Sequence, residues 1–419
     1  MAITPYDRWL AGLETNLAQL EHSGRRRRLA AVNSSQGPEI VLAGRTVLQF
    51  CNNDYLGLSS HPAVKEAARR AIDRFGFGAG ASRLVAGSME LHHALERRLA
   101  ALKRTPQALV FSSGYLANIA ALTTFAGPDA AIVSDKLNHA SLLDAARFSG
   151  AWHRTFPHRN VARAQALLAR FRAATATTVP DEGAAPALVP APARNRRNAF
   201  CVTDSVFSMD GDLADLAALC AMAQQQEALV VIDEAHATGI FGANGAGLAE
   251  EQGVENQIAI SIGTLSKALG SIGGFVAGAA PVIETLINNA RSFIFTTALP
   301  PAASAAALAA LDLIAADAQP RQRLRAAAGY VAAEIAGLGY VCGAGLAPII
   351  PVIFGASETA LAASRALLEQ GIYVPAIRPP TVARGSARLR ITLSAAHTDA
   401  QIECLLTALR RLREKMQRC

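Results

Sequence analysis

"VVIDEAHATG", residues 230–239, passes directly from an apolar β-type run into Asp233, Glu234 and His236. The apolar residues suit a buried strand, which leaves Asp233 at the edge of a low-dielectric interior, where a carboxylate needs a cationic or hydrogen-bonding partner. No adjacent Arg or Lys supplies one in the sequence. Asp233 is therefore a candidate for holding a cationic nitrogen of a ligand. The alternative is an aspartate that caps the next helix.

The same change from apolar to polar recurs between about residues 60 and 300. Short β-rich runs alternate there with helical patterns, which predicts an α/β fold with a large, mostly parallel sheet covered by helices on both faces. Ligands bind beyond the carboxyl ends of the strands in such sheets, so polar residues that follow strands are candidate site residues. The β-rich runs are "ALVFSS" (108–113), "AIVSD" (131–135), "AFCVTDSV" (199–206), "ALVVIDEA" (228–235), "IAISIG" (258–263) and "GGFVAG" (273–278).

The chain as a whole divides into three predicted parts. The first two differ in their pattern of apolar residues, and an alanine-rich helix after the prolines at 300–301 opens the third. They are residues 1–55, with a helix up to Gly24 and a β segment at 38–50 that turns at Ala43-Gly44; residues 56–300, the large α/β domain, with a Pro- and Ala-rich surface insertion at about 173–198; and residues 301–419, a smaller α+β domain with strands at 347–354 and 387–394.

The composition is that of a globular chain that can bury large cores. Of 419 residues, 51% are hydrophobic and 17% are charged, which excludes a disordered chain. No apolar run is long enough to span a membrane, and the N-terminal stretch does not resemble a secretory signal. The six cysteines are scattered, so we expect a reducing cytoplasm and no disulfide framework or zinc site. Aromatic residues make up only 5% of the chain, and nucleic acid binding is not expected.

The net charge of +7 comes partly from "RRRR" at 25–28. This run could attract phosphates or an acidic partner. On the sequence alone we favour the alternative, a solvated basic face at the end of the first helix.

Lysine is scarce in this chain, and one lysine stands in an unexpected place. Only five of the 40 basic residues are lysines, and Lys267 lies in "GTLSKALG" (263–270) between two apolar runs. A desolvated lysine loses its proton more readily and becomes a nucleophile, whereas an arginine stays protonated. The alternative is a lysine whose stem packs on an apolar surface while its head reaches water.

Other polar residues follow predicted strands as well. Taken alone, His139 is a satisfied core histidine, Gly114-Tyr115 is an ordinary strand-to-helix turn that suits a phosphate, and Ser208 with Asp210 is an N-cap cluster. Combined with a lysine nucleophile and an aspartate for a ring nitrogen, they describe a pyridoxal phosphate site.

The chain resembles the α-oxoamine synthases, a fold-type I family of pyridoxal phosphate transferases, from about Phe50 to His397. The motifs that carry the resemblance are "NDYLGLSSHP" (53–62), "GFGAGASRLVAGSMELHHALE" (76–96), "FSSGYLAN" (111–118), "NHASLLDA" (138–145), "VFSMDGD" (206–212), "DEAHATGIFG" (233–242), "GTLSKALG" (263–270), "FIFTTALPP" (293–301) and "AIRPPTVARGSARLRITLSAAHT" (376–398).

The resemblance implies a role for each matching residue. Lys267, His139 and Asp233 are the implied catalytic residues. Lys267 forms the Schiff base with the cofactor and moves the proton, Asp233 pairs with the pyridine nitrogen, and His139 stacks on the ring. His236 and Ser208 lie near the phenolic oxygen. Thr264 with the Gly114-Tyr115 backbone holds the phosphate, and Thr296 or Thr297 reaches the phosphate of a neighbouring subunit in a homodimer.

The resemblance also implies the substrates. Among family members, the motif series most resembles those that join L-alanine to a pimeloyl thioester, on CoA or acyl carrier protein, with loss of CO2 in biotin biosynthesis. The implied substrate residues are Asn53 and Arg390 for the amino acid carboxylate, Thr381 and Arg378 in and beside "RPPT", His139, and either Arg26 or Arg27.

Three alternatives remain at this stage. "VARG" (382–385) also resembles the 5-aminolevulinate synthases, so another member, such as a 2-amino-3-ketobutyrate CoA ligase or one that uses a different acyl thioester, is the nearest rival. An aminotransferase would share the lysine and the aspartate. A non-enzymatic subunit would lack Lys267.

Overall fold

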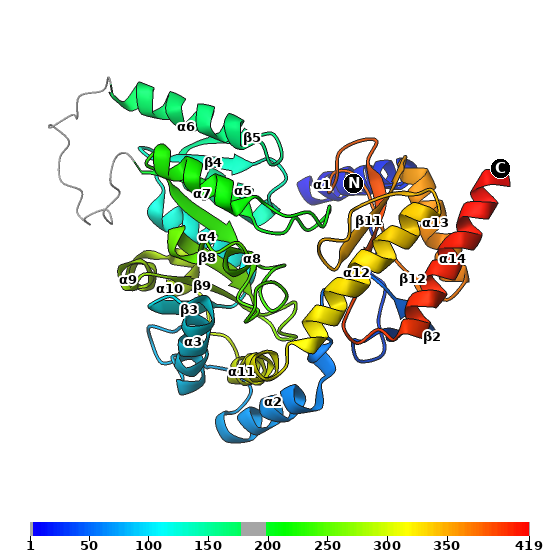
Figure 1. Ribbon diagram of the computed structural model, residues 1–419, viewed down its shortest axis with the longest axis horizontal. Coiled ribbons are helices and arrows are strands. Elements are labelled where there is room, and N and C mark those ends of the chain that lie inside the picture. Colours follow the sequence, from blue (N-terminus) through cyan, green and yellow to red (C-terminus); the bar gives the residue numbers. More distant parts are fainter. Residues whose placement is uncertain (1–2, 177–197, 419) are drawn as a thin grey trace. The chain divides into compact units, whose positions relative to one another are not determined.

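The computed structural model describes residues 3–176 and 198–418, which form two compact units (Figure 1). The larger unit spans residues 53–326, and the smaller unit combines residues 1–52 with residues 327–419. Most of the predicted insertion at 173–198 lies outside the described residues. Its first four residues, predicted as surface loop, are instead helical and end α6 (Val161–Ala176).

The large unit is built on a sheet that is seven-stranded within the described residues, in the order β3-β9-β8-β7-β6-β4-β5. β9 runs antiparallel to both of its neighbours, and the other pairs are parallel, so the predicted mostly parallel sheet is confirmed. The strands are β3 (Gln107–Phe111), β4 (Ala131–Asp135), β5 (Trp152–Phe156), β6 (Ala199–Asp204), β7 (Leu229–Asp233), β8 (Ile258–Thr264) and β9 (Gly274–Gly278).

Helices cover both faces of this sheet, because successive strand residues point to opposite sides. On β3, Leu109 and Phe111 pack into a core with α4, α5, α9 and α10, whereas Ala108 and Val110 pack into a second core with α2, α3 and α11. The helices of this unit are α2 (Pro62–Phe75), α3 (Glu90–Lys103), α4 (Gly114–Phe125), α5 (Ala140–Phe148), α6 (Val161–Ala176), α7 (Leu216–Gln225), α8 (Leu248–Glu251), α9 (Ala280–Asn289), α10 (Arg291–Ile294) and α11 (Pro301–Ala316).

The edge strand β5 was not predicted. Its sequence, "WHRTF", is polar and carries one fully buried residue, Phe156, because an edge strand needs little apolar surface. A short polar strand of this kind gives no strong period-2 signal.

The small unit contains two further sheets, in the orders β1-β2-β12 and β10-β11-β14-β13. The predicted turn at Ala43-Gly44 joins β1 to β2, and both residues have positive φ, 49° and 78°. The elements are α1 (Pro5–His22), β1 (Glu39–Leu42), β2 (Arg45–Gln49), β10 (Val341–Cys342), β11 (Ile349–Gly355), α13 (Ser357–Glu369), β12 (Ile372–Tyr373), β13 (Ala376–Ile377), β14 (Ala387–Thr392) and α14 (Asp399–Arg418), and α12 (Gln319–Gly337) begins in the large unit and ends here.

The two units divide the chain differently from the three predicted parts. α11 packs against α2 and α3 through alanines such as Ala302 and Ala305, so residues 301–326 group with the large unit. The N-terminal segment groups with the C-terminal one because β2 pairs with β12 in parallel, Leu48 opposite Ile372. Pairing between strands so distant in sequence leaves no local signal.

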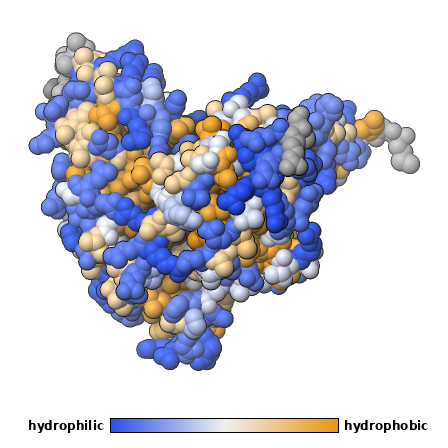
Figure 2. Space-filling view, turned by 45° about the vertical axis from the view of Figure 1, so that its right-hand side comes forward, coloured by the Kyte–Doolittle hydropathy of each residue, from blue (hydrophilic) through white to orange (hydrophobic). Residues whose placement is uncertain are grey.

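Within residues 3–176 and 198–418, no single helix is both long and apolar enough to cross a membrane, although α11 and α12 taken together, across a sharp bend, meet that length and composition. Figure 2 shows hydrophobic residues interspersed among hydrophilic ones on the face that it draws.

Candidate active site

Three aspartates end neighbouring strands of the large sheet. Asp135 ends β4, Asp204 ends β6 and Asp233 ends β7, and the pairing of β6 with β7 sets Asp204 directly opposite Asp233. All three are buried. The parallel strands therefore bring polar groups to the edge where an α/β sheet binds its ligand.

Asp233 is held by neutral hydrogen-bond donors. Its carboxylate accepts from the Asn118 side-chain amide at 2.7 Å and from the Ala235 N–H at 2.8 Å, and the residue is only 6% exposed. No Arg or Lys forms an ion pair with Asp233 in the part of the chain that the structure describes. A carboxylate buried among neutral donors is suited to pair with a cationic ligand nitrogen.

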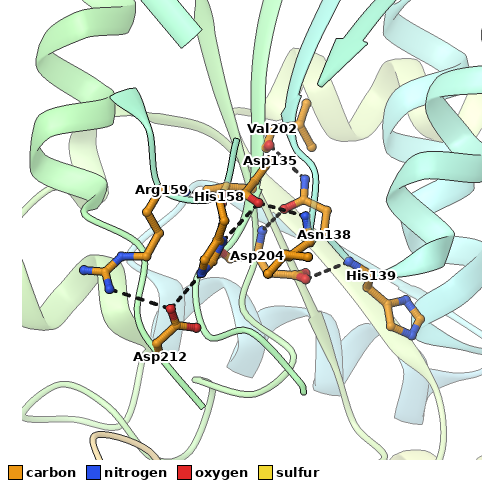
Figure 3. Close-up of polar contacts among 10 residues, drawn as sticks. Asp135, Asn138, His139, His158, Arg159, Val202, Asp204 and Asp212 are labelled. Atoms are coloured by element: carbon orange, nitrogen blue, oxygen red, sulfur yellow. Dashed lines mark hydrogen bonds and ion pairs between the residues drawn. The ribbon is translucent and has the colours of Figure 1, made fainter. Parts of the chain in front are cut away.

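The neighbouring Asp204 has a different character. Burial first, and the charge of Asp233 second, raise the pKa of Asp204 well above its usual range. Its Oδ2 accepts the backbone N–H of His139 at 2.7 Å (Figure 3). Asp204 therefore holds the His139 backbone, and burial favours its neutral form.

His139 is the N-cap residue of α5, and its neighbours define its tautomer. Its Nδ1 lies 2.6 Å from the Ser141 hydroxyl and accepts the Ser141 N–H at 3.3 Å, so the hydrogen-bond network assigns the ring proton to Nε2. Burial chiefly lowers the pKa of His139; the charge of Asp233 raises this pKa and that of Lys267 lowers it. The ring is therefore neutral at pH 7, which suits stacking on a flat ligand.

Lys267 begins a chain of hydrogen bonds that reaches Asn53. Its Nζ lies 2.8 Å from Nε2 of His236, and Nδ1 of His236 lies 2.7 Å from the Tyr55 hydroxyl. That hydroxyl donates to Oδ1 of Asn53 at 3.2 Å. Because an ammonium group only donates, a protonated Lys267 assigns the His236 proton to Nδ1. Four side chains from three segments of the chain thus form one path of donors and acceptors.

The first turn of α4 lies against the end of β8, next to Thr264. A Cβ on Gly114 would lie 3.4 Å from the Thr264 hydroxyl oxygen, and a Cβ on Gly274 would lie 2.6 Å from the Gly114 nitrogen. Ser113 caps the helix, whereas the N–H groups of Gly114 and Tyr115 have no acceptor inside an α-helix. These N–H groups and the helix dipole form an anion site that suits a phosphate.

Three other predicted cofactor residues lie on loops of the same unit. Ser208 is half-buried in the loop between β6 and α7. Thr296 is half-buried, and the exposed Thr297 forms an isolated β-bridge with Ser82. The predicted reach of Thr296 or Thr297 to the phosphate of a second subunit stays a prediction.

Most of the predicted substrate residues lie in the small unit, where the structure separates two arginines that the sequence left equivalent. Arg27 donates to the Thr381 hydroxyl at 3.0 Å. Arg26 instead pairs with Glu21 at 3.4 Å. Of the two, Arg27 is therefore the one that adjoins another predicted substrate residue.

Arg378 and Arg390 also belong to the small unit. Arg378 donates to the Gly24 carbonyl. Arg390 is buried on β14, and its charge lowers the pKa of Cys51, although burial outweighs it and raises that pKa to about 12. Arg390 therefore lies close enough to Cys51 for its charge to affect the pKa of that thiol.

Comparison with known proteins identifies the family. The aminotransferase class I and II family model matches residues 45–409. An 8-amino-7-oxononanoate synthase from Anaeromyxobacter dehalogenans is 45% identical over 393 residues, which cover 94% of this chain and 93% of that protein. Another, from Stutzerimonas stutzeri, is 46% identical over 390 residues and 93% of both chains. The chain belongs to the α-oxoamine synthase family.

Solved structures of α-oxoamine synthases share the fold. A serine palmitoyltransferase from S. paucimobilis matches with a TM-score of 0.87 and 30% identity over 97% of this chain and 98% of that one. An 8-amino-7-oxononanoate synthase from Francisella tularensis matches with a TM-score of 0.72 and 27% identity over 88% of this chain and 99% of that one. The predicted family and fold-type I architecture are confirmed.

Sequence reasoning missed a buried ion pair next to Asp233 of the candidate site. The Lys103 Nζ lies 2.6 Å from Glu234 Oε2 and 3.0 Å from the Thr238 hydroxyl, and it also donates to the Ala246 carbonyl. Glu234 follows Asp233, so the pair fixes the backbone from which the site carboxylate projects. The scarcity of lysine was the available signal, because Lys103 is another of the five.

We expect Lys103→Met to lower the free energy of unfolding by about 3–5 kcal/mol, because it leaves the Glu234 carboxylate buried and unpaired. Arg104→Met is the matched control. The Arg104 side chain is 57% exposed and pairs with Glu255 at 3.0 Å, so its loss should cost about 1 kcal/mol or less. Calorimetric unfolding of the two variants measures the difference, and equal losses would show that the buried pair has no special weight.

Proposed function

We propose that this chain is an 8-amino-7-oxononanoate synthase, a pyridoxal 5'-phosphate-dependent acyltransferase. It condenses L-alanine with pimeloyl-CoA or pimeloyl-[acyl carrier protein], with loss of CO2, in biotin biosynthesis, and works as a cytoplasmic homodimer. The observation that carries the proposal is the convergence of Lys267, His139 and Asp233, whose charges act on one another, in a chain 45% identical to a protein of that name.

The residues at the strand ends suit each part of the cofactor. When bound, pyridoxal phosphate supplies an electron sink for the negative charge that develops on the amino acid Cα. Asp233 would pair with the ring nitrogen of the cofactor, Lys267 would hold the cofactor covalently, and His139 would stack on its ring. His236 and Ser208 would face its phenolic oxygen. Thr264 with the N–H groups of Gly114 and Tyr115 would bind its phosphate.

Each catalytic side chain has one task in this proposal. The Lys267 amine takes the proton from the amino acid Cα and returns it to the product. The hydrogen bonds through His236 and Tyr55 offer a path along which that amine can pass on a proton. Asp233 keeps a proton on the ring nitrogen by electrostatic attraction, and the neutral His139 adds no competing positive charge.

Each unit contributes candidate substrate residues. Asn53 and Arg390 would bind the amino acid carboxylate, and the contact between Arg27 and Thr381 supports a role for both in binding the far carboxylate of the pimeloyl chain. A guanidinium is the side chain best suited to a carboxylate. Arg378 would support the same loop.

A homodimer is supported by large apolar side chains that are exposed on the large unit. Phe77, Val85 and Phe295 are 72%, 80% and 71% exposed. The segment with Val85 is anchored by Arg83, whose guanidinium makes two hydrogen bonds to the Glu96 carboxylate, at 2.8 Å and 3.0 Å. Rigidly held, exposed aromatic side chains are typical of a surface that a partner covers.

A different acyl chain is the second candidate, because the serine palmitoyltransferase structure matches with a TM-score of 0.87. Product analysis with L-alanine, glycine and L-serine against pimeloyl, acetyl, succinyl and palmitoyl thioesters separates the two. Fastest turnover with any pair other than L-alanine and the pimeloyl thioester would overturn the proposal.

Borohydride reduction of the holoenzyme should attach the cofactor to Lys267. Peptide mass spectrometry locates the label, and Lys267→Ala should lose both the visible absorbance of the bound cofactor and nearly all turnover, since no other amine can take the Cα proton. The exposed Lys65 and Lys136 serve as internal controls. A label on either of them would contradict the assignment.

Asp233→Asn should slow exchange of the amino acid Cα proton with solvent roughly tenfold to a hundredfold or more, because one charge-assisted hydrogen bond of about 1.5–3 kcal/mol is lost. Asp204→Asn is the matched control: burial favours a neutral Asp204, and an amide oxygen still accepts the His139 N–H. NMR of the exchanging Cα proton measures both rates. Near-wild-type exchange in Asp233→Asn would mean that Asp233 only caps the following turn.

Arg27→Ala should raise the KM for the pimeloyl thioester about tenfold or more, whereas Arg26→Ala should change it little, because a charge-assisted contact is lost only in the first variant. Steady-state kinetics with an uncharged acyl chain of equal length on the same carrier provides the control. If both chains lose affinity equally in Arg27→Ala, the arginine binds the carrier instead.

A further inference from the structure

His158 follows β5 and lies between two carboxylates (Figure 3). Its Nδ1 lies 3.1 Å from both carboxylate oxygens of Asp135, and its Nε2 lies 2.7 Å from Oδ2 of Asp212. An ionised carboxylate only accepts hydrogen bonds, and a neutral imidazole has a single N–H. The geometry therefore favours an imidazolium, which donates to both.

Asp135 opens the turn that ends at His139, residues 135–139, which we call the His139 turn. Asp135 accepts the backbone N–H of Leu137 at 2.8 Å and that of Arg159 at 2.7 Å. His158 and its neighbour Arg159 thus hold the start of this turn.

Strand β6 holds the other end of the His139 turn. Asn138 donates to the Val202 carbonyl at 2.9 Å and accepts the Asp204 N–H at 3.0 Å, and the His139 N–H is bound by the Asp204 carboxyl. The backbone of the His139 turn is therefore fixed at both ends.

Asp212 closes a second segment, residues 205–212, which we call the Ser208 loop. The Asp212 carboxylate reaches His158, and the ring of Phe207 meets the His158 ring edge-on, with centroids 4.4 Å apart and planes at 88°. Arg159 adds a weaker contact to Asp212 at 3.6 Å. His158 is the one side chain in Figure 3 that donates to carboxylates from both segments.

We propose that His158 is a positioning residue, which ties the His139 turn to the Ser208 loop as an imidazolium and so fixes the two side chains that meet the cofactor from neighbouring strands. The inference rests on the proposed function for the roles of His139 and Ser208. His158 itself touches neither cofactor nor substrate in this scheme.

The charge of His158 makes the tie dependent on pH. Burial alone would lower the pKa of His158, but hydrogen bonds and charge from Asp135 and Asp212 outweigh it and raise the pKa to about 9. The other charged group beside it is Arg159, and beyond Asp135 lies Asp204, whose own pKa burial raises. Because the folded pKa is raised, the stabilisation is complete below the unfolded pKa of about 6.5 and is lost as pH rises through about 9.

The test compares His158→Gln with His153→Gln in the full-length holoenzyme. His153 is the matched control, because it is also half-buried and its Nε2 lies 2.8 Å from the Ser134 hydroxyl on β4, but it contacts a single strand and does not join the His139 turn to the Ser208 loop. Asp212→Asn is a second, milder variant, which keeps the shape of the side chain but removes the charge that His158 holds in the Ser208 loop.

The first measurement is the thermal midpoint from pH 6.5 to pH 10. The midpoint of the wild type should exceed that of His158→Gln at pH 6.5, and the gap should close above pH 9, whereas the gap to His153→Gln should stay constant. This readout needs no turnover. A gap to His158→Gln that is independent of pH would overturn the imidazolium.

The second measurement is the rate of Cα-proton exchange at pH 7.5. It should fall at least about tenfold in His158→Gln and by a smaller factor in Asp212→Asn, with the KM for the acyl thioester unchanged within about twofold, because misplaced side chains slow the chemical step. Equal effects in His158→Gln and His153→Gln would overturn the positioning role. A wild type that neither binds cofactor nor exchanges the proton would instead refute the proposed function, and the thermal measurement would still decide the charge of His158.

Discussion

The site depends on keeping a negative charge buried at the end of a central strand. Asp233 lies there beside neutral donors, and the neighbouring groups limit the repulsion that such a charge creates. The aspartate opposite it on β6 has a raised pKa, so the two do not both stay fully charged. Behind it, Lys103 compensates the adjacent Glu234 inside the core. This arrangement leaves Asp233, at the ligand edge of the sheet, as the carboxylate proposed to meet a cationic ring nitrogen.

The sequence predicted the elements of the large unit because each central strand is an apolar run followed at once by a polar residue, as in β4, β6 and β7. It predicted Asp233, Lys267 and His139 by position after such strands and by resemblance to a family. It could not predict the partners of these residues. Asn118, Tyr55 and Lys103 contact the site from far away in the sequence, and such contacts leave no periodic pattern. The polar edge strand β5 was missed for a related reason: its single buried ring gives too little signal.

The residues with proposed roles occur in both units. The residues proposed to hold the cofactor lie in the large unit, whereas Arg27, Thr381, Arg378 and Arg390 lie in the small one. The motifs of the large unit therefore indicate the type of reaction that the whole family shares. The proposed role of Arg27 in binding the acyl chain rests on a single contact: the sequence alone left Arg26 and Arg27 equivalent, and the hydrogen bond to Thr381 distinguishes them.

The pairing of β2 with β12 has a consequence for folding during synthesis on the ribosome. Residues 1–52 are translated before the large unit and before their own strand partner, since Leu48 pairs with Ile372, more than three hundred residues later. All strands of the large sheet are synthesised between these two residues. The large unit can therefore fold during synthesis, before residues 1–52 have their pairing strand. The α1 helix has no buried residue, and its apolar side chains, Trp9 among them, are exposed in the folded unit as well. The small unit is thus completed only after the large unit has been synthesised, and its last strand pairing closes a long loop.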